Sequence, residues 1–190
     1  MPMPFLLDTN AYYLFFQFPK SPSYLRLTQK VKAGTKMSFY ISEITSMEIH
    51  SVLGKYHRRS PRQLQQCKRE IIVDGQTAKC SNTWIFPGRK RLKLKVFRDI
   101  RKMISDIETR RGDIQATMLK LNDSSIARAR ELLMKYADRY NHSSHDALIA
   151  ASLIIARKVQ GLDLTLVTSD KGLQAVLRDE AIPFYDPATT

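Results

Sequence analysis

Short apolar runs alternate along the chain with longer stretches whose apolar residues recur at helical spacing. The short runs predict buried strands, and several long stretches begin with serine or proline and end at glycine, as helices do. Because strands that alternate with helices are joined by right-handed crossovers, the pattern predicts an α/β fold with a mostly parallel sheet covered on both faces. We expect strands at residues 4–8, 36–41, 116–123, 164–170 and 182–186, and helices at residues 10–18, 21–34, 42–59, 97–112, 124–140, 143–161 and 171–180.

The length and the middle of the chain bear on its domain organisation. A chain of 190 residues is long enough for one well-buried domain and short for two, so we expect a single domain over residues 1–190. From about residue 59 to residue 100 the helical pattern gives way to turn signals at residues 74–75 and 87–88, and residues 82–94 predict a hairpin. We interpret residues 59–100 as an insertion in that domain.

The charge balance indicates a polyanionic partner. The chain has 31 Lys and Arg against 18 Asp and Glu, a net charge of +13. Such an excess attracts nucleic acid through phosphate neutralisation, although an acidic membrane surface or an acidic protein would also fit. No stretch approaches the roughly 18 consecutive apolar residues of a membrane span, so we expect a soluble, cytoplasmic protein. Cys67 and Cys80 lack zinc-ligand spacing, and we expect reduced thiols.

Two aspartates each follow an apolar strand at its carboxyl end. Asp8 comes directly after the first predicted strand, and Asp170 ends the strand at residues 164–170. Ligands bind at this edge of open parallel α/β sheets. Aspartate is also favoured there as a helix cap or turn residue, and for either residue alone that explanation is sufficient.

Two further acids lie in predicted helices. Glu48 has Ile44 and Val52 one turn to either side, so its helix face is partly apolar, whereas a helical glutamate usually points to water. Asp146 lies near the start of the most apolar helix of the chain, where an acid also suits the helix dipole. Both have an ordinary structural explanation beside a functional one.

Four acids near one sheet edge would repel one another unless a cation neutralised them. A set of oxygen ligands suits Mg²⁺ or Mn²⁺ and not zinc. Such an ion can activate water and stabilise the charge that develops on a phosphodiester. The pattern therefore points to metal-dependent phosphodiester hydrolysis.

Four segments together carry a family resemblance: "FLLDTN", the glutamate of "ISEITSMEI", "HDALIAA" and "LVTSD". In this order they resemble PIN-domain ribonucleases, and most closely the VapC-type toxins of toxin-antitoxin pairs. The resemblance covers about residues 4–58 and 114–186 and leaves the insertion outside it. Compact VapC-type toxins generally lack an insertion of this size, so the chain departs from the pattern there.

The resemblance implies a three-layer α/β/α sandwich and a Mg²⁺- or Mn²⁺-dependent endoribonuclease that leaves 5′-phosphate and 3′-hydroxyl ends. It implies RNA as the substrate, a homodimer, and a cognate antitoxin as a partner. The matching positions make four acids both the catalytic residues and the metal ligands, and two polar residues their support. The acids are Asp8, Glu48, Asp146 and Asp170, and the supporting residues are Asn10 and Thr168.

Basic residues surround two aromatic residues in the insertion. Cations that follow phosphates, with aromatics on which bases stack, are typical of single-stranded nucleic-acid binding. Alternatively the aromatics pack into the core and the charges are solvated, or this face binds an acidic antitoxin. The candidate RNA-binding residues are Arg58, Arg59, Trp84, Phe86, Arg89, Lys90, Arg91, Lys93 and Lys95.

A non-catalytic PIN-fold RNA-binding or scaffold protein is the rival function, and an incomplete acidic set would favour it.

The histidines show no ligand spacing. We expect His142 to be solvated, and we expect His145 to point in a different direction from its neighbour Asp146 on the helix.

Overall fold

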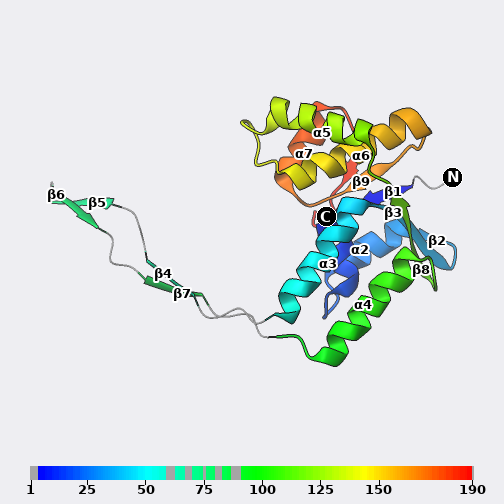
Figure 1. Ribbon diagram of the computed structural model, residues 1–190, viewed down its shortest axis with the longest axis horizontal. Helices are drawn as coiled ribbons and strands as arrows, with labels where there is room; N and C mark the ends of the chain where they lie inside the picture. The colour runs from blue at the N-terminus through cyan, green and yellow to red at the C-terminus, as the bar shows by residue number, and fades with distance from the viewer. Residues whose placement is uncertain are drawn as a thin grey trace. The chain divides into compact units, whose positions relative to one another are not determined.

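The computed structural model describes residues 4–58, 63–66, 70–74, 76–79, 83–86 and 91–189 (Figure 1). Backbone contacts divide the chain into two compact units, one of residues 1–51 and 100–190 and one of residues 52–99. The second unit includes most of the insertion interpreted from the sequence. The assignment of residues 1–190 to a single domain stays a prediction.

The larger unit is built on a sheet of five parallel strands in the order β10-β9-β1-β3-β8, with β2 antiparallel to the start of β3. The register pairs Leu7 of β1 with Ile41 of β3 on one side and with Val167 of β9 on the other. This confirms the mostly parallel sheet. The strands are β1 (Phe5–Leu7), β2 (Lys32–Ala33), β3 (Lys36–Ser42), β8 (Ile114–Leu119), β9 (Thr165–Val167) and β10 (Phe184–Tyr185).

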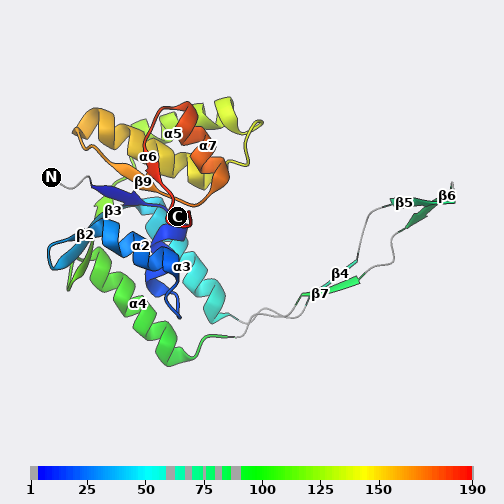
Figure 2. The ribbon, with the colours of Figure 1, turned by 180° about the vertical axis from the view of Figure 1, so that it is seen from behind.

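Helices cover both faces of this sheet. Figures 1 and 2 show α5, α6 and α7 on one side, and α2 with the part of α4 from Ile100 onwards on the other. The three-layer α/β/α sandwich is therefore confirmed. The helices are α1 (Thr9–Tyr13), η1 (Leu14–Phe16), α2 (Pro22–Val31), α3 (Glu43–His57), α4 (Leu94–Glu108), α5 (Asp123–Tyr136), α6 (Ser144–Gln160) and α7 (Lys171–Asp179).

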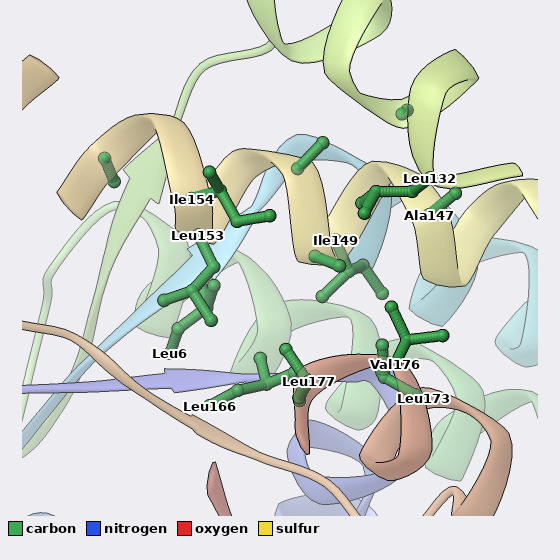
Figure 3. Packing of buried hydrophobic residues seen from close by; sticks show 14 of the residues in the cluster. Leu6, Leu132, Ala147, Ile149, Leu153, Ile154, Leu166, Leu173, Val176 and Leu177 are labelled. Carbon is green, nitrogen blue, oxygen red and sulfur yellow. The ribbon is translucent and has the colours of Figure 1, made fainter. Parts of the chain in front are cut away.

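Helix α6 forms the centre of the larger core cluster because most of its side chains are buried. Figure 3 shows Ile149 and Leu153 of α6 facing the sheet and α7, where they pack with Leu6 and Leu166. On the opposite face of the sheet the core is aromatic: the rings of Phe15 and Phe39 stack at 5.2 Å, and the ring of Tyr12 meets Phe39 edge-on at 6.0 Å. Buried apolar side chains thus pack against both faces of the sheet.

The ends of α6 follow the cap chemistry of the sequence. Ser143 and Asp146 form a reciprocal capping box at the start, and Gly161 ends the helix with φ of +66°, a conformation that favours glycine. The predicted range of residues 143–161 is confirmed.

The described residues of the smaller unit form two antiparallel strand pairs, and here one prediction was wrong. The described part of residues 82–94 does not form the predicted hairpin: β7 (Thr83–Phe86) pairs with β4 (Gln63–Gln66), and α4 already begins at Leu94. The alternation of leucine and lysine at residues 92–95 is too short to separate a strand from a first helical turn. The other pair joins β5 (Glu70–Val73) to β6 (Gln76–Lys79). Cys67, Cys80 and the predicted turn at residues 87–88 lie outside the described residues.

Within the described part of the chain, no helix combines the length and the apolar character needed to cross a membrane.

Candidate active site

Asp8 and Asp170 lie at the carboxyl ends of neighbouring parallel strands. Leu7 of β1 pairs with Val167 of β9, and the backbone N–H of Asp8 donates to the carbonyl of Val167 at 3.1 Å. Each aspartate is also the N-cap of the helix that follows, because its Oδ1 accepts the backbone N–H three residues on, at 2.7 Å and 2.8 Å. The capping explanation therefore holds for both residues, and both lie at the predicted edge of the sheet.

Asp146 belongs to the first turn of α6. Its Oδ2 accepts the backbone N–H of Ser143 at 2.9 Å and the Ser143 hydroxyl at 2.7 Å. The loop before Ser143 packs closely against α7, since a Cβ added at Gly172 would lie 2.1 Å from the carbonyl oxygen of Asn141. This close approach fixes the start of α6 beside the Asp170 cap.

Glu48 is held by two side chains from different elements. Its Oε2 accepts a hydrogen bond from the Thr9 hydroxyl, and its Oε1 lies 2.9 Å from Nδ1 of His145. His145 thus points towards Glu48 of α3, whereas its neighbour Asp146 turns back to Ser143, so the two side chains differ in direction as expected. Thr9 was missed because nothing in the sequence distinguishes it from its polar neighbours.

The Asp8 carboxylate has an unfavourable environment for its charge. It is 3% exposed. Burial, together with the smaller effect of the charges of Asp170 and Asp146, raises the pKa of Asp8 from 3.8 to about 7, against hydrogen bonds from Thr168 and from the backbone of Ala11 that lower it. A proton or a cation beside Asp8 would relieve this cost.

The two predicted supporting residues differ in their surroundings. Thr168 is fully buried, and its hydroxyl accepts the backbone N–H of Asp170 at 3.1 Å and hydrogen-bonds to Asp8. Asn10 is exposed. Thr168 is thus positioned to orient two of the acids, and the role of Asn10 stays a prediction.

His142 is a feature that the sequence prediction missed. It is 7% exposed, so the expectation of a solvated histidine was wrong, because the loop before α6 is pressed into the domain. Neither ring nitrogen has a hydrogen-bond partner among the described residues. Burial lowers the pKa of His142, and the charges of Asp146 and Asp170 oppose that shift.

The acids fit a hard divalent cation in charge and in donor chemistry. The helix caps use Oδ1 of Asp8 and Asp170, and the capping box uses Oδ2 of Asp146, so a second oxygen of each lies outside the cap. In the described ranges, no three carboxylate, imidazole or thiol side chains form a ready-made ligand group. A bound ion would therefore need these side chains to turn towards it.

The candidate RNA-binding residues are only partly described. Arg58, Arg91, Lys93 and Lys95 are exposed, and the guanidinium of Arg91 lies 3.3 Å from Nε2 of His57. The remaining candidates lie outside the described residues: Arg59, Arg89 and Lys90 entirely, and Trp84 and Phe86 in their side chains.

Solved structures with a similar fold were found. One, FitAcB from Neisseria gonorrhoeae, aligns with a TM-score of 0.57 and 15% identity over 98% of this chain and 99% of that chain. Another, a toxin-antitoxin complex from Klebsiella pneumoniae, aligns with a TM-score of 0.52 and 16% identity over 98% of this chain and 100% of that chain. No protein-family model and no curated protein matches the sequence. At these identities the likeness establishes a shared fold.

Proposed function

We propose that the protein is a Mg²⁺- or Mn²⁺-dependent endoribonuclease that hydrolyses RNA at the edge of the sheet where Asp8 and Asp170 meet. The observation that carries the proposal is the buried Asp8 carboxylate, whose pKa is raised to about 7 by burial and by the charges of Asp170 and Asp146. Carboxylates whose pKa values are shifted by burial and by the repulsion of neighbouring carboxylates are typical of functional sites.

In this proposal the acids share one task, which is to hold a divalent cation. A bound divalent cation would neutralise the acids, activate a water and stabilise charge on the phosphate. Asp8, Asp170 and Asp146 would hold it through the oxygens that the caps leave over. Thr168 orients Asp8, and Glu48, fixed by Thr9 and His145, completes the acidic set.

The basic residues would bind the RNA backbone. The net charge of +13 and the exposed Arg58, Arg91, Lys93 and Lys95 support a salt-sensitive interaction with phosphates. Binding of this kind is independent of sequence, so it supports RNA as a class of substrate and not a particular RNA.

We further propose that the protein acts as the toxin of a toxin-antitoxin pair. The similar fold in a toxin-antitoxin complex from Klebsiella pneumoniae supports this. An antitoxin would inhibit the protein by covering the acidic edge, and co-purification with the product of an adjacent small reading frame, with loss of cleavage in the complex, would test it.

The nuclease is tested with purified protein, end-labelled RNA and the matching DNA, in Mg²⁺, Mn²⁺ or EDTA. We expect RNA fragments only with metal, and at least a hundredfold slower cleavage by Asp146→Asn. Asp123→Asn is the matched control, because Asp123 is also a first-turn acid, of helix α5. Cleavage that survives in Asp146→Asn, or that falls equally in Asp123→Asn, would contradict the assignment.

A second candidate function rests on one observation. Because no three potential ligands gather among the described residues, the fold would also suit a non-catalytic RNA-binding or scaffold protein. The same assay separates the two functions: RNA binding that weakens with salt, without fragments in any metal, would favour the scaffold.

A further inference from the structure

A fifth acid, Asp186, lies at the same edge of the sheet as the proposed metal ligands. It directly follows β10, whose Tyr185 pairs with Val167 of β9, so Asp186 and the β9–α7 loop leave neighbouring strands at the same end. Its side chain is 7% exposed. Nothing in the family resemblance uses this residue.

The Asp186 carboxylate is fully occupied by hydrogen bonds. Its Oδ1 accepts the Ser169 hydroxyl at 2.6 Å and the backbone N–H of Ala188 at 2.8 Å. Its Oδ2 accepts Nζ of Lys171 at 3.0 Å and Nε2 of Gln174 at 2.9 Å. Burial alone would raise the pKa of Asp186, but these bonds outweigh it and hold the pKa well below the ordinary value. Asp186 is therefore a fixed anion at every physiological pH.

Gln174 extends this network to the proposed site. The same Nε2 that donates to Asp186 also donates to the backbone carbonyl of Thr168 at 2.9 Å. The Thr168 hydroxyl in turn accepts the backbone N–H of Asp170 and hydrogen-bonds to Asp8. Asp186 is thus linked through Gln174 to the backbone of Thr168, whose hydroxyl contacts two of the acids.

We infer that Asp186 is a positioning residue for the acidic site: through Gln174 it fixes Thr168, and thereby the orientation of Asp8 and Asp170 towards a metal. The inference rests on the proposed function, since it adds a positioning residue to that metal site. Residues that orient metal ligands in this way commonly contribute a factor of about 10 to 100 in metal affinity.

A purely structural role for Asp186 is the alternative. The segment after Asp186 is tied to α2, where Nε of Arg26 donates to the carbonyl of Pro187 at 2.8 Å, so Asp186 could serve only to attach this segment. Glu180 offers a matched comparison, because it is also a largely buried carboxylate that joins several side chains: Arg128, Lys135 and Tyr136.

The test measures Mn²⁺ affinity, by electron paramagnetic resonance of the free ion, for the wild type and three variants. Asp186→Asn replaces one carboxylate oxygen by an NH2 group that faces two donors in either orientation of the amide, so the fixed arrangement that holds Gln174 is lost. Gln174→Met removes the link to Thr168 but leaves Ser169, Lys171 and Ala188 on Asp186. Glu180→Gln is the control for lost stability, and thermal unfolding is recorded for every variant.

We expect Kd for Mn²⁺ to rise about tenfold or more in Asp186→Asn and Gln174→Met and to change less than twofold in Glu180→Gln. An unchanged Kd in Gln174→Met, or an equal rise in Glu180→Gln, would overturn the inference while leaving the metal site in place. A wild type that binds no Mn²⁺ would overturn the metal site, and this inference with it.

Discussion

Replacement of Asp8 by asparagine should make the metal-free protein more stable at pH 8. The pKa of Asp8 is raised from 3.8 to about 7, first by burial and then by Asp170 and Asp146, so the folded state binds this proton more tightly than the unfolded chain. Above pH 7 the charged carboxylate lowers the free energy of unfolding by roughly 1.4 kcal/mol for each unit by which its folded pKa exceeds its unfolded pKa, or ~4 kcal/mol in all. Asn caps a helix as well as Asp does, so the variant keeps the bond to Ala11 without the charge.

Urea unfolding in EDTA measures the effect. At pH 8 we expect Asp8→Asn to be more stable than the wild type by ~2–4 kcal/mol. The difference should shrink as the pH falls from 7 towards 4, because the folded wild type then takes up the proton and the cost disappears. Added Mn²⁺ should stabilise only the wild type, by ~2.7 kcal/mol at a hundredfold excess over its Kd.

Two results would refute this reasoning. A variant less stable than the wild type at pH 8 in EDTA would show that Asp8 acts as an ordinary cap whose charge is favourable. A stability difference independent of pH would show that burial does not disturb the titration of Asp8.

Two further predictions concern packing and charge. Gly172→Ala should destabilise the protein by about 1–3 kcal/mol, because the new Cβ would lie 2.1 Å from a backbone carbonyl oxygen. Gly54→Ala should instead stabilise it by about 0.5–1 kcal/mol, because Gly54 lies in α3 with open space around it. Urea unfolding compares the two variants, and a shift in the same direction for both would contradict the packing argument. The association constant K for RNA falls as salt is added. Simultaneous replacement of Arg91, Lys93 and Lys95 by alanine should make the slope of log K against log salt less steep, by about 1 for each phosphate that the variant no longer neutralises. Filter binding across a salt series measures the slope, and an unchanged slope would show that these residues do not bind phosphate.

Local chemistry explains which parts of the fold were predictable. The start of α6 at Ser143 and its end at Gly161 depend on caps that the sequence displays directly. Gly34 was taken as the end of a helix at residues 21–34, but α2 ends at Val31, and Gly34, with φ of +66°, lies in the turn between β2 and β3. A left-handed glycine suits both structures, and only the pairing of β2 with β3 separates them.

In the site too, only the residues with a local sequence signal could be predicted. Asp8 and Asp170 were found because acids after apolar strands must meet at one edge of a parallel sheet. The contact of His145 with Glu48 and the path from Asp186 to Thr168 could not be found in this way, because they join elements far apart in the sequence. The acids carry a local signal, and the residues that hold them do not.

The central claim is that these acids perform metal-dependent hydrolysis, and the chemistry of the cleaved ends tests it most directly. A defined RNA oligonucleotide is cleaved by the wild type and by Asp8→Asn, with Mn²⁺ and with EDTA, and the product ends are identified by mass spectrometry. We predict 5′-phosphate and 3′-hydroxyl ends, formed only by the wild type and only with Mn²⁺. Fragments in EDTA, or 2′,3′-cyclic phosphate ends from attack by the neighbouring ribose hydroxyl, would contradict the account.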